Sequence, residues 1–210
     1  MLQLLDHYRP TPLESAIDQF YQRKKIFHPS DIDLTFFAED ANIRILYQPL
    51  SSITYQLTTF DAIIIDRRLP FRQQKVELAH ELGHVLMHVG RQDFMEDDFR
   101  AMQEWQADRF ALYALVPAFM IKNYIIPTNS RLRLITHLSD IFEVPETLME
   151  ERLRLLEERL RSLVAEQQMA YQMNEVRSTY DYSYRHPTNP TLEYLVKDGV
   201  VIGRRRRSET

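Results

Sequence analysis

The segment that most constrains this chain is His80-Glu81-Leu82-Gly83-His84, which lies within KVELAHELGHVLMHVG. In a helix, residues three and four apart share a face, so His80, Glu81 and His84 would project together. Two imidazoles one turn apart can bind a single tetrahedral metal ion such as zinc. The glutamate beside them is then placed to act on water at the metal. The spacing therefore predicts a helix that carries a metal site.

A third ligand and a supporting carboxylate follow later in the sequence. A catalytic zinc needs three protein ligands and an open fourth position for water. Glu104 would complete a His₂Glu set with His80 and His84. Asp108, one helical turn beyond Glu104, can accept a hydrogen bond from the second nitrogen of a ligating histidine and hold its ring in place. Glu81 is then left as the general base, so we expect a hydrolytic site.

Three other residues are candidates for secondary roles at this site. His88 continues the series of histidines along the helix, as a ligand, a transition-state donor or a histidine at the helix end. The structural role is favoured, because one more turn carries the ring away from the metal. A hydrolytic site also needs a donor for the developing oxyanion, and both Tyr113 and His137 are candidates for it.

Composition excludes several other classes of protein. The 210 residues are 44% hydrophobic and 27% charged, which suits one medium domain with appendages or with a small second domain. The net charge of -4 gives no electrostatic case for nucleic-acid binding, and the absence of cysteine excludes disulfides, thiolate ligands and cysteine catalysis. Neither a signal peptide nor an apolar run of about 18 residues is evident, so we expect no membrane span and a cytoplasmic protein.

Periodicity and capping residues predict an α+β fold. Short β-branched runs at 43–47, 53–57 and 62–65, separated by turn-length gaps, indicate a small, mainly antiparallel sheet. Helical spacing predicts long helices over 12–25, 70–89, 98–115, 130–142 and 145–170, and short ones after Ser30 or Asp31 and after Pro117. Gly90 would end the active-site helix, and an acidic loop would run from Asp93 to Asp98.

The region after Tyr171 has a different character. Residues 174–191 show no sustained period and are interpreted as a loop or extended linker, whereas Lys197-Asp198-Gly199 within 192–202 indicates a hairpin. Tyr180, Tyr182 and Tyr184 either dock on the catalytic domain or a partner, or belong to a disordered tail with a terminal hairpin. The terminal run Arg204–Arg207 is interpreted as a solvated end rather than as a contact for nucleic acid or an acidic partner.

Two segments resemble a known family. LAHELGHVLMH followed by EWQADRFALYALVP resembles the ImmA/IrrE family of bacterial metallo-endopeptidases, as does the preceding IIIDRRLPFRQQKVELAHELGH. The resemblance covers roughly residues 10–160 and is most specific over 62–117. It implies a gluzincin-like zinc fold with His80, His84 and Glu104 as ligands and Glu81 as the catalytic acid/base.

The residue patterns divide the chain near residues 125 and 170, and the resemblance implies what the first part is and what substrate it acts on. Residues 1–125 would form a zincin-like metallopeptidase domain, 126–170 a helical extension, and 171–210 an extended linker with a terminal hairpin and a basic end. Compact members of the family are often encoded on phages and integrative elements, where they cleave or inactivate a nearby helix-turn-helix repressor. The leading hypothesis is thus a zinc-dependent endopeptidase that hydrolyses such a repressor.

Two other functions compete with this hypothesis. A non-hydrolytic protein could use the same zinc fold to sequester a repressor, but Glu81 is intact and no fourth protein ligand is evident. A DNA-binding regulator would rest on residues 134–153, which faintly resemble a helix-turn-helix. Their second helix begins with Pro145-Glu146 and carries Glu150 and Glu151, which would repel phosphate, so packing or partner docking is favoured there.

Overall fold

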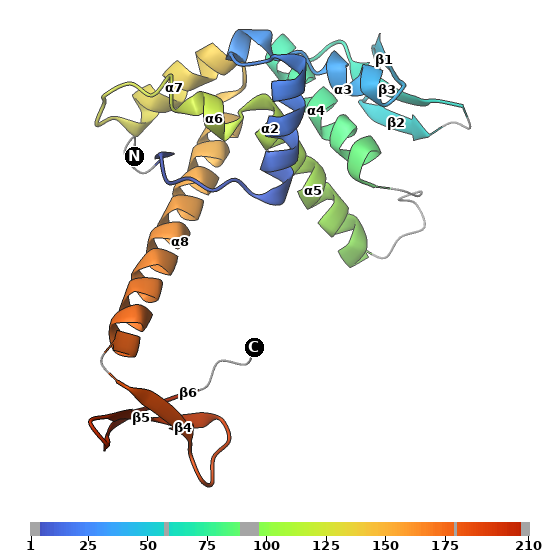
Figure 1. Ribbon diagram of the computed structural model, residues 1–210. Coiled ribbons are helices and arrows are strands. Elements are labelled where there is room, and N and C mark those ends of the chain that lie inside the picture. The colour runs from blue at the N-terminus through green and yellow to red at the C-terminus, as the bar shows by residue number, and fades with distance from the viewer. Residues whose placement is uncertain (1–4, 57–58, 89–96, 179, 207–210) are drawn as a thin grey trace. The chain divides into compact units, whose positions relative to one another are not determined.

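The computed structural model describes residues 5–56, 59–88, 97–178 and 180–206, and it divides into two compact units, residues 1–159 and 160–210 (Figure 1). The predicted α+β class is confirmed. The predicted domain limits near residues 125 and 170 stay predictions. No helix in the described ranges is both long and apolar enough to cross a membrane.

Helices make up most of the first unit. They are α2 (Pro12–Lys24), the 3₁₀ turn η1 (Pro29–Asp31), α3 (Thr35–Asp40), α4 (Phe71–Met87), α5 (Asp97–Leu115), α6 (Ala118–Ile121), α7 (Arg131–Phe142) and the start of α8 (Glu146–Ser178). The predicted long helices are confirmed, although α8 continues well past residue 170. The helix expected directly after Ser30 or Asp31 is wrong, because only a 3₁₀ turn forms there and the helix begins at Thr35.

Local capping explains where α2 and α7 begin. The Thr11 hydroxyl accepts from the backbone N–H of Glu14, and the Glu14 carboxylate accepts from the backbone N–H of Thr11, forming a reciprocal capping box. Ser130 accepts in the same way from the backbone N–H of Arg133 at the start of α7. These bonds satisfy backbone donors that have no partner within the helix.

The first unit contains one three-stranded sheet, whose order is β1-β3-β2. Strand β3 (Asp61–Asp66) is central, parallel to β1 (Ile43–Gln48) and antiparallel to β2 (Ile53–Gln56). The prediction of a mainly antiparallel sheet is therefore wrong for this sheet, which is mixed. The most apolar strand, β3, lies in the middle, where Ile63 and Ile65 are fully buried, and it separates β1 from β2.

Helix α4 lies between this sheet and α5 (Figure 1). Its buried residues Leu78, Ala79 and Leu82 face the core, which leaves the opposite side of the helix available for polar side chains. The predicted stop at Gly90 and the predicted acidic loop from Asp93 fall mainly on residues 89–96, outside the described part. The helices on both sides of that segment are α4 and α5, and they carry the metal-site candidates.

The second unit comprises the C-terminal part of α8 and an antiparallel sheet of order β4-β5-β6, with strands Tyr182–Arg185, Leu192–Lys197 and Val200–Arg206. The predicted hairpin is confirmed: Asp198 and Gly199 both have positive φ, as a type I′ turn requires. The linker predicted over 174–191 is wrong, because it contains the end of α8 and strand β4. The arginine run lies in β6 as far as Arg206.

Candidate metal centre

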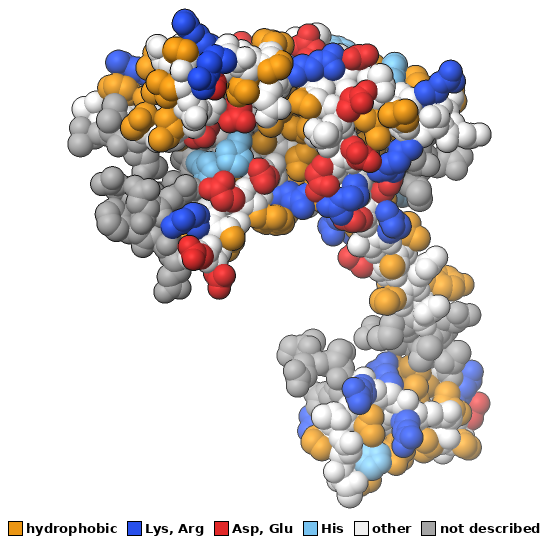
Figure 2. Space-filling model, turned by 180° about the vertical axis from the view of Figure 1, so that it is seen from behind, with side chains coloured by type: hydrophobic (Ala, Val, Ile, Leu, Met, Phe, Trp, Pro, Cys, Tyr) orange, Lys and Arg blue, Asp and Glu red, His pale blue; other side chains and the backbone are white. Residues whose placement is uncertain are grey.

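Three side chains from two helices meet at one point. His80 and His84 come from one face of α4, and Glu104 comes from the facing side of α5. The two histidine Nε2 atoms are 2.9 Å apart, and the Glu104 Oε2 atom lies 3.3 Å from His80 Nε2 and 3.4 Å from His84 Nε2. Figure 2 shows histidine side chains reaching the surface of this unit beside acidic ones.

These separations fit a tetrahedral metal ion. Zinc binds imidazole nitrogen and carboxylate oxygen at about 2.0–2.2 Å, so two ligand atoms of one tetrahedral zinc are about 3.3 Å apart. The donor atoms of His80, His84 and Glu104 lie within 4.8 Å of one another, and all three residues are only partly buried. Two nitrogens and one oxygen with access from solvent are the donor set of a catalytic rather than a structural zinc.

Asp108 holds the ring of His80. The His80 Nδ1–H donates to Asp108 Oδ1 across 2.9 Å, and its Nε2 lies beside Glu104 and His84. A carboxylate on the second nitrogen sets the tautomer and raises the basicity of a ligating histidine. The Asp108 side chain is 67% exposed, so this contact orients the ring at the surface rather than within the core.

Burial favours the neutral form of His84. The pKa of its imidazole is lowered, chiefly because burial disfavours the charged ring and also because His80 lies beside it. A metal ligand must present an unprotonated nitrogen, so a lowered pKa removes a competing proton near neutral pH.

Glu81 is not among the three donors and forms a hydrogen bond with the sheet. The Thr54 hydroxyl of β2 donates to Glu81 Oε2 across 2.6 Å. Burial raises the pKa of Glu81 above its usual range, although the bond from Thr54 and the charge of His80 act in the opposite direction. A carboxylate with a raised pKa is a better proton acceptor near neutral pH, as a general base requires.

Thr54 was not among the residues predicted from sequence, although a signal for it was present. Side chains alternate across a strand, so Thr54 lies on the face opposite to that of Ile53 and Tyr55. The face that carries Thr54 is the one covered by α4. A polar residue on the covered face of a strand needs a hydrogen-bond partner. The identity of that partner depends on how α4 packs on the sheet.

The secondary candidates lie in other environments. His88 donates through Nε2 to the backbone carbonyl of Gln103 at 3.1 Å, which agrees with a structural role at the helix end. The Arg152 guanidinium lies over the Tyr113 ring, with Arg152 Cζ 4.6 Å from the ring centroid. His137 donates to the backbone carbonyl of Tyr124 at 3.1 Å. These contacts do not bring Tyr113 or His137 to the three donor atoms.

Gly83 determines how closely the two ligand-bearing helices approach. A Cβ atom at this position would lie 2.9 Å from Ala107 Cα, 3.1 Å from the Ala107 carbonyl oxygen and 3.2 Å from Phe110 Cβ. The first two atoms belong to the backbone of α5 and cannot rotate away. The absence of a side chain therefore allows α4 and α5 to place His84 and Glu104 side by side.

Replacing Gly83→Ala is expected to lower the free energy of unfolding by about 1–2 kcal/mol, because overpacking outweighs the gain of about 1 kcal/mol in helix propensity. The variant should also lose metal to a chelator faster than the parent protein, since the helices must separate. Urea unfolding and chelator competition measure the two effects. Gly203→Ala is the control, because its Cβ would lie 3.9 Å from the nearest atom, Leu195 Cδ1. Unchanged stability and metal retention in Gly83→Ala would contradict this account.

A two-histidine, one-glutamate site on facing helices, with a glutamate beside it, is the arrangement of a metallopeptidase-type protein. Comparison with known proteins agrees with this class. The chain belongs to the IrrE N-terminal-like domain family, a peptidase family whose profile matches residues 38–154. That range includes all the residues of the candidate site, and the resemblance to the ImmA/IrrE family is confirmed.

Two relatives come from Bacillus subtilis (strain 168). The chain is 27% identical over 165 residues to the phage-like element PBSX protein XkdA, covering 79% of this chain and 83% of that protein. It is 25% identical over 148 residues to the uncharacterized protein YqaB, covering 70% of this chain and 86% of that protein.

Proposed function

We propose that this protein is a zinc-dependent endopeptidase. The observation that carries the proposal is the convergence of His80 Nε2, His84 Nε2 and Glu104 Oε2 at mutual distances of 2.9–3.4 Å, beside an uncoordinated glutamate. When bound there, zinc would lower the pKa of a coordinated water to about 7 and polarise a peptide carbonyl. His80, His84 and Glu104 would hold the ion, and Asp108 would keep His80 oriented.

Glu81 is the residue that moves the proton. It takes a proton from the attacking water as the water oxygen bonds to the carbonyl carbon. It then gives that proton to the amide nitrogen as the carbon–nitrogen bond breaks. The Thr54 hydroxyl holds one carboxylate oxygen at 2.6 Å and limits its rotation. The raised pKa of Glu81, caused mainly by burial, supports both the acceptance and the return of the proton.

Strand β2 provides a place for an extended peptide. It is an edge strand of the three-stranded sheet and pairs with β3 on one side only. Thr54, the second of its four residues, contacts Glu81, so a peptide that pairs with the open edge would pass beside the catalytic group. Main-chain hydrogen bonds to a sheet edge bind a substrate with little dependence on its sequence.

A helix-turn-helix repressor is the substrate that we propose. The family resemblance and the similarity to a phage-like element protein support this choice. Such repressors act where the chromosome is, and the lack of cysteine suits a reducing compartment, so we propose that the protein works in the cytoplasm. Cleavage would separate the DNA-binding part of the repressor from the rest and relieve repression.

Coexpression with the helix-turn-helix repressor encoded nearest to this gene tests the function. We expect intact-mass analysis to show two repressor fragments whose masses sum to the parent plus one water. His84→Ala, which removes a metal donor, should leave the repressor whole and serves as the control. A stable complex with uncut repressor in the presence of zinc would instead identify a non-hydrolytic binding protein.

A further inference from the structure

The two faces of the C-terminal sheet carry different side chains. Directly paired residues of neighbouring strands point to the same side. The register pairs Tyr184 with Tyr194 and Tyr194 with Arg204, and it pairs Leu192 with Arg206. Tyrosines of β4 and β5 therefore share one face with alternate arginines of β6.

The arginines of β6 differ in their partners. Arg205 points to the opposite face, where its Nη2 lies 3.0 Å from Glu193 Oε2. Arg204 and Arg206 are exposed and form no ion pair with another described residue. The strand positions on their face carry no carboxylate, because Glu193 lies on the other side. Among the described residues, these two cations of β6 therefore have no carboxylate paired with them.

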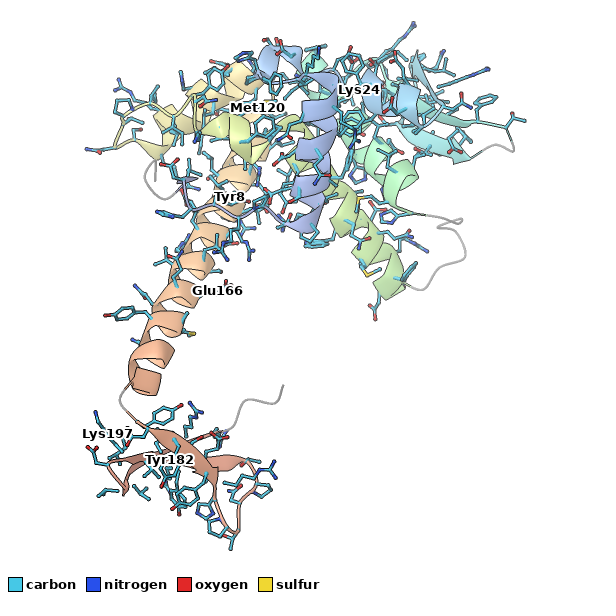
Figure 3. All side chains as sticks on the ribbon, viewed as in Figure 1. Tyr8, Lys24, Met120, Glu166, Tyr182 and Lys197 are labelled. Atoms are coloured by element: carbon cyan, nitrogen blue, oxygen red, sulfur yellow. The ribbon has the colours of Figure 1, made fainter. Side chains whose placement is uncertain are left out.

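Aromatic rings lie on the same face of the sheet as these two cations. The Tyr184 and Tyr194 ring centroids are 5.4 Å apart, and the His186 ring stacks on Tyr194 at 4.8 Å with an interplanar angle of 27°. Tyr182, at the other end of β4, is 55% exposed (labelled in Figure 3). Figure 2 shows apolar and basic side chains together with a histidine on the visible side of this sheet.

We propose that this aromatic–arginine face, formed by Tyr182, Tyr184, His186, Tyr194, Arg204 and Arg206, binds single-stranded nucleic acid. Exposed rings offer surfaces on which unpaired bases stack, and unpaired guanidinium groups attract the phosphates that connect those bases. A duplex keeps its bases stacked internally, so it would use only the arginines. An acidic peptide would likewise leave the rings unused.

The net charge of the whole chain does not reveal this basic face, because the charges are unevenly distributed along the sequence. The chain carries a net charge of -4, whereas residues 180–206 contain five Lys or Arg against three Asp or Glu. Electrostatic attraction falls off over about 8–10 Å at physiological salt, so the local charge governs a contact with phosphate. The inference concerns the second unit alone and does not depend on the proposed peptidase activity.

Fluorescence anisotropy on the full-length protein tests the proposal. The probes are a labelled 15-nucleotide oligo-dT, an oligo-rU of the same length and a 15-base-pair duplex. We expect both single strands to bind with similar affinity, because stacking and phosphate contacts do not involve the sugar, and the duplex to bind at least about fivefold more weakly. Binding should weaken with salt as counterions are released.

Charge-matched variants separate this face from general attraction. Arg204→Gln/Arg206→Gln should weaken binding about tenfold and reduce the slope of log affinity against log salt by about 1.4, which corresponds to two phosphate contacts on a single strand. Arg185→Gln/Lys197→Gln removes the same charge from the opposite face and should change affinity less than about threefold. Circular dichroism of each variant verifies that the sheet is retained.

A second pair of variants tests the stacking. Tyr184→Ser should weaken binding by about tenfold, whereas Tyr171→Ser, which alters a tyrosine of α8 that is 70% exposed, should have little effect. Failure of the parent protein to bind either strand at low salt would overturn the proposal. So would equal losses in the two charge variants, or displacement of the oligonucleotide by polyglutamate as effectively as by unlabelled oligo-dT.

Discussion

Substituting Glu81→Gln is expected to lower the rate of repressor cleavage by about 10²–10⁴-fold while zinc stays bound. An amide cannot accept the proton of the attacking water, but it keeps the size of the side chain. Its carbonyl oxygen can still accept the bond that Thr54 now donates to Glu81 Oε2. The proposed metal donors His80, His84 and Glu104 are not altered.

Cleavage rate and zinc content are to be measured on the same preparations, by fragment formation over time and by elemental mass spectrometry. Glu77→Gln is the matched control, because Glu77 lies one turn earlier on α4 and accepts a hydrogen bond from Gln73. It should keep both zinc and activity. Retained cleavage by Glu81→Gln would disprove the assigned role of Glu81.

Replacing Arg152→Met is expected to reduce the free energy of unfolding by about 3–5 kcal/mol. The Arg152 Nη2 atom lies 2.6 Å from Glu14 Oε1, and both side chains are 1% exposed. The arginine also donates through Nε to the carbonyl of Val116 at 2.8 Å. Removing it leaves a buried carboxylate with hydrogen bonds from Tyr8 and the Thr11 backbone but without a counter-charge.

This ion pair joins α2 to α8 and to the end of α5 within the first unit; Figure 3 labels Tyr8 on the segment that precedes α2. The double variant Glu14→Gln/Arg152→Met should be more stable than Arg152→Met alone, because it removes the isolated charge. Arg154→Met is the control: its side chain is 44% exposed, and its pairs with Glu151 and Glu158 should contribute less than about 1 kcal/mol. Equal losses in Arg152→Met and Arg154→Met, measured by urea unfolding, would contradict this interpretation.

The ligand candidates could be identified from sequence because each pair is local. His80 and His84 are one turn apart on one helix, and Glu104 and Asp108 are one turn apart on the next. Helical geometry alone puts each pair on a single face. The helix boundaries were also predictable, since capping residues such as Thr11 and Ser130 act within three residues of where they occur.

Non-local features were not predictable in the same way. Thr54 and Glu81 are 27 residues apart, and Glu14 and Arg152 are 138 residues apart, so no periodicity connects them. The parallel pairing of β1 with β3 was not predicted, because hydrophobic alternation specifies which face of a strand is buried but not which strand is its neighbour. Strand β4 was missed because four residues between polar and proline-rich segments give too short a pattern.

The sequence alone therefore determined the class of chemistry, because residue type and helical spacing are enough to specify a set of metal donors. The tertiary packing determined how those donors meet. Gly83 lets α4 and α5 approach closely enough for His84 Nε2 and Glu104 Oε2 to lie 3.4 Å apart. The mixed sheet brings the Thr54 hydroxyl to Glu81. The strand register of the second sheet also placed Arg204 and Arg206 on the same face as Tyr184 and Tyr194. These arrangements depend on long-range packing, which local patterns do not encode.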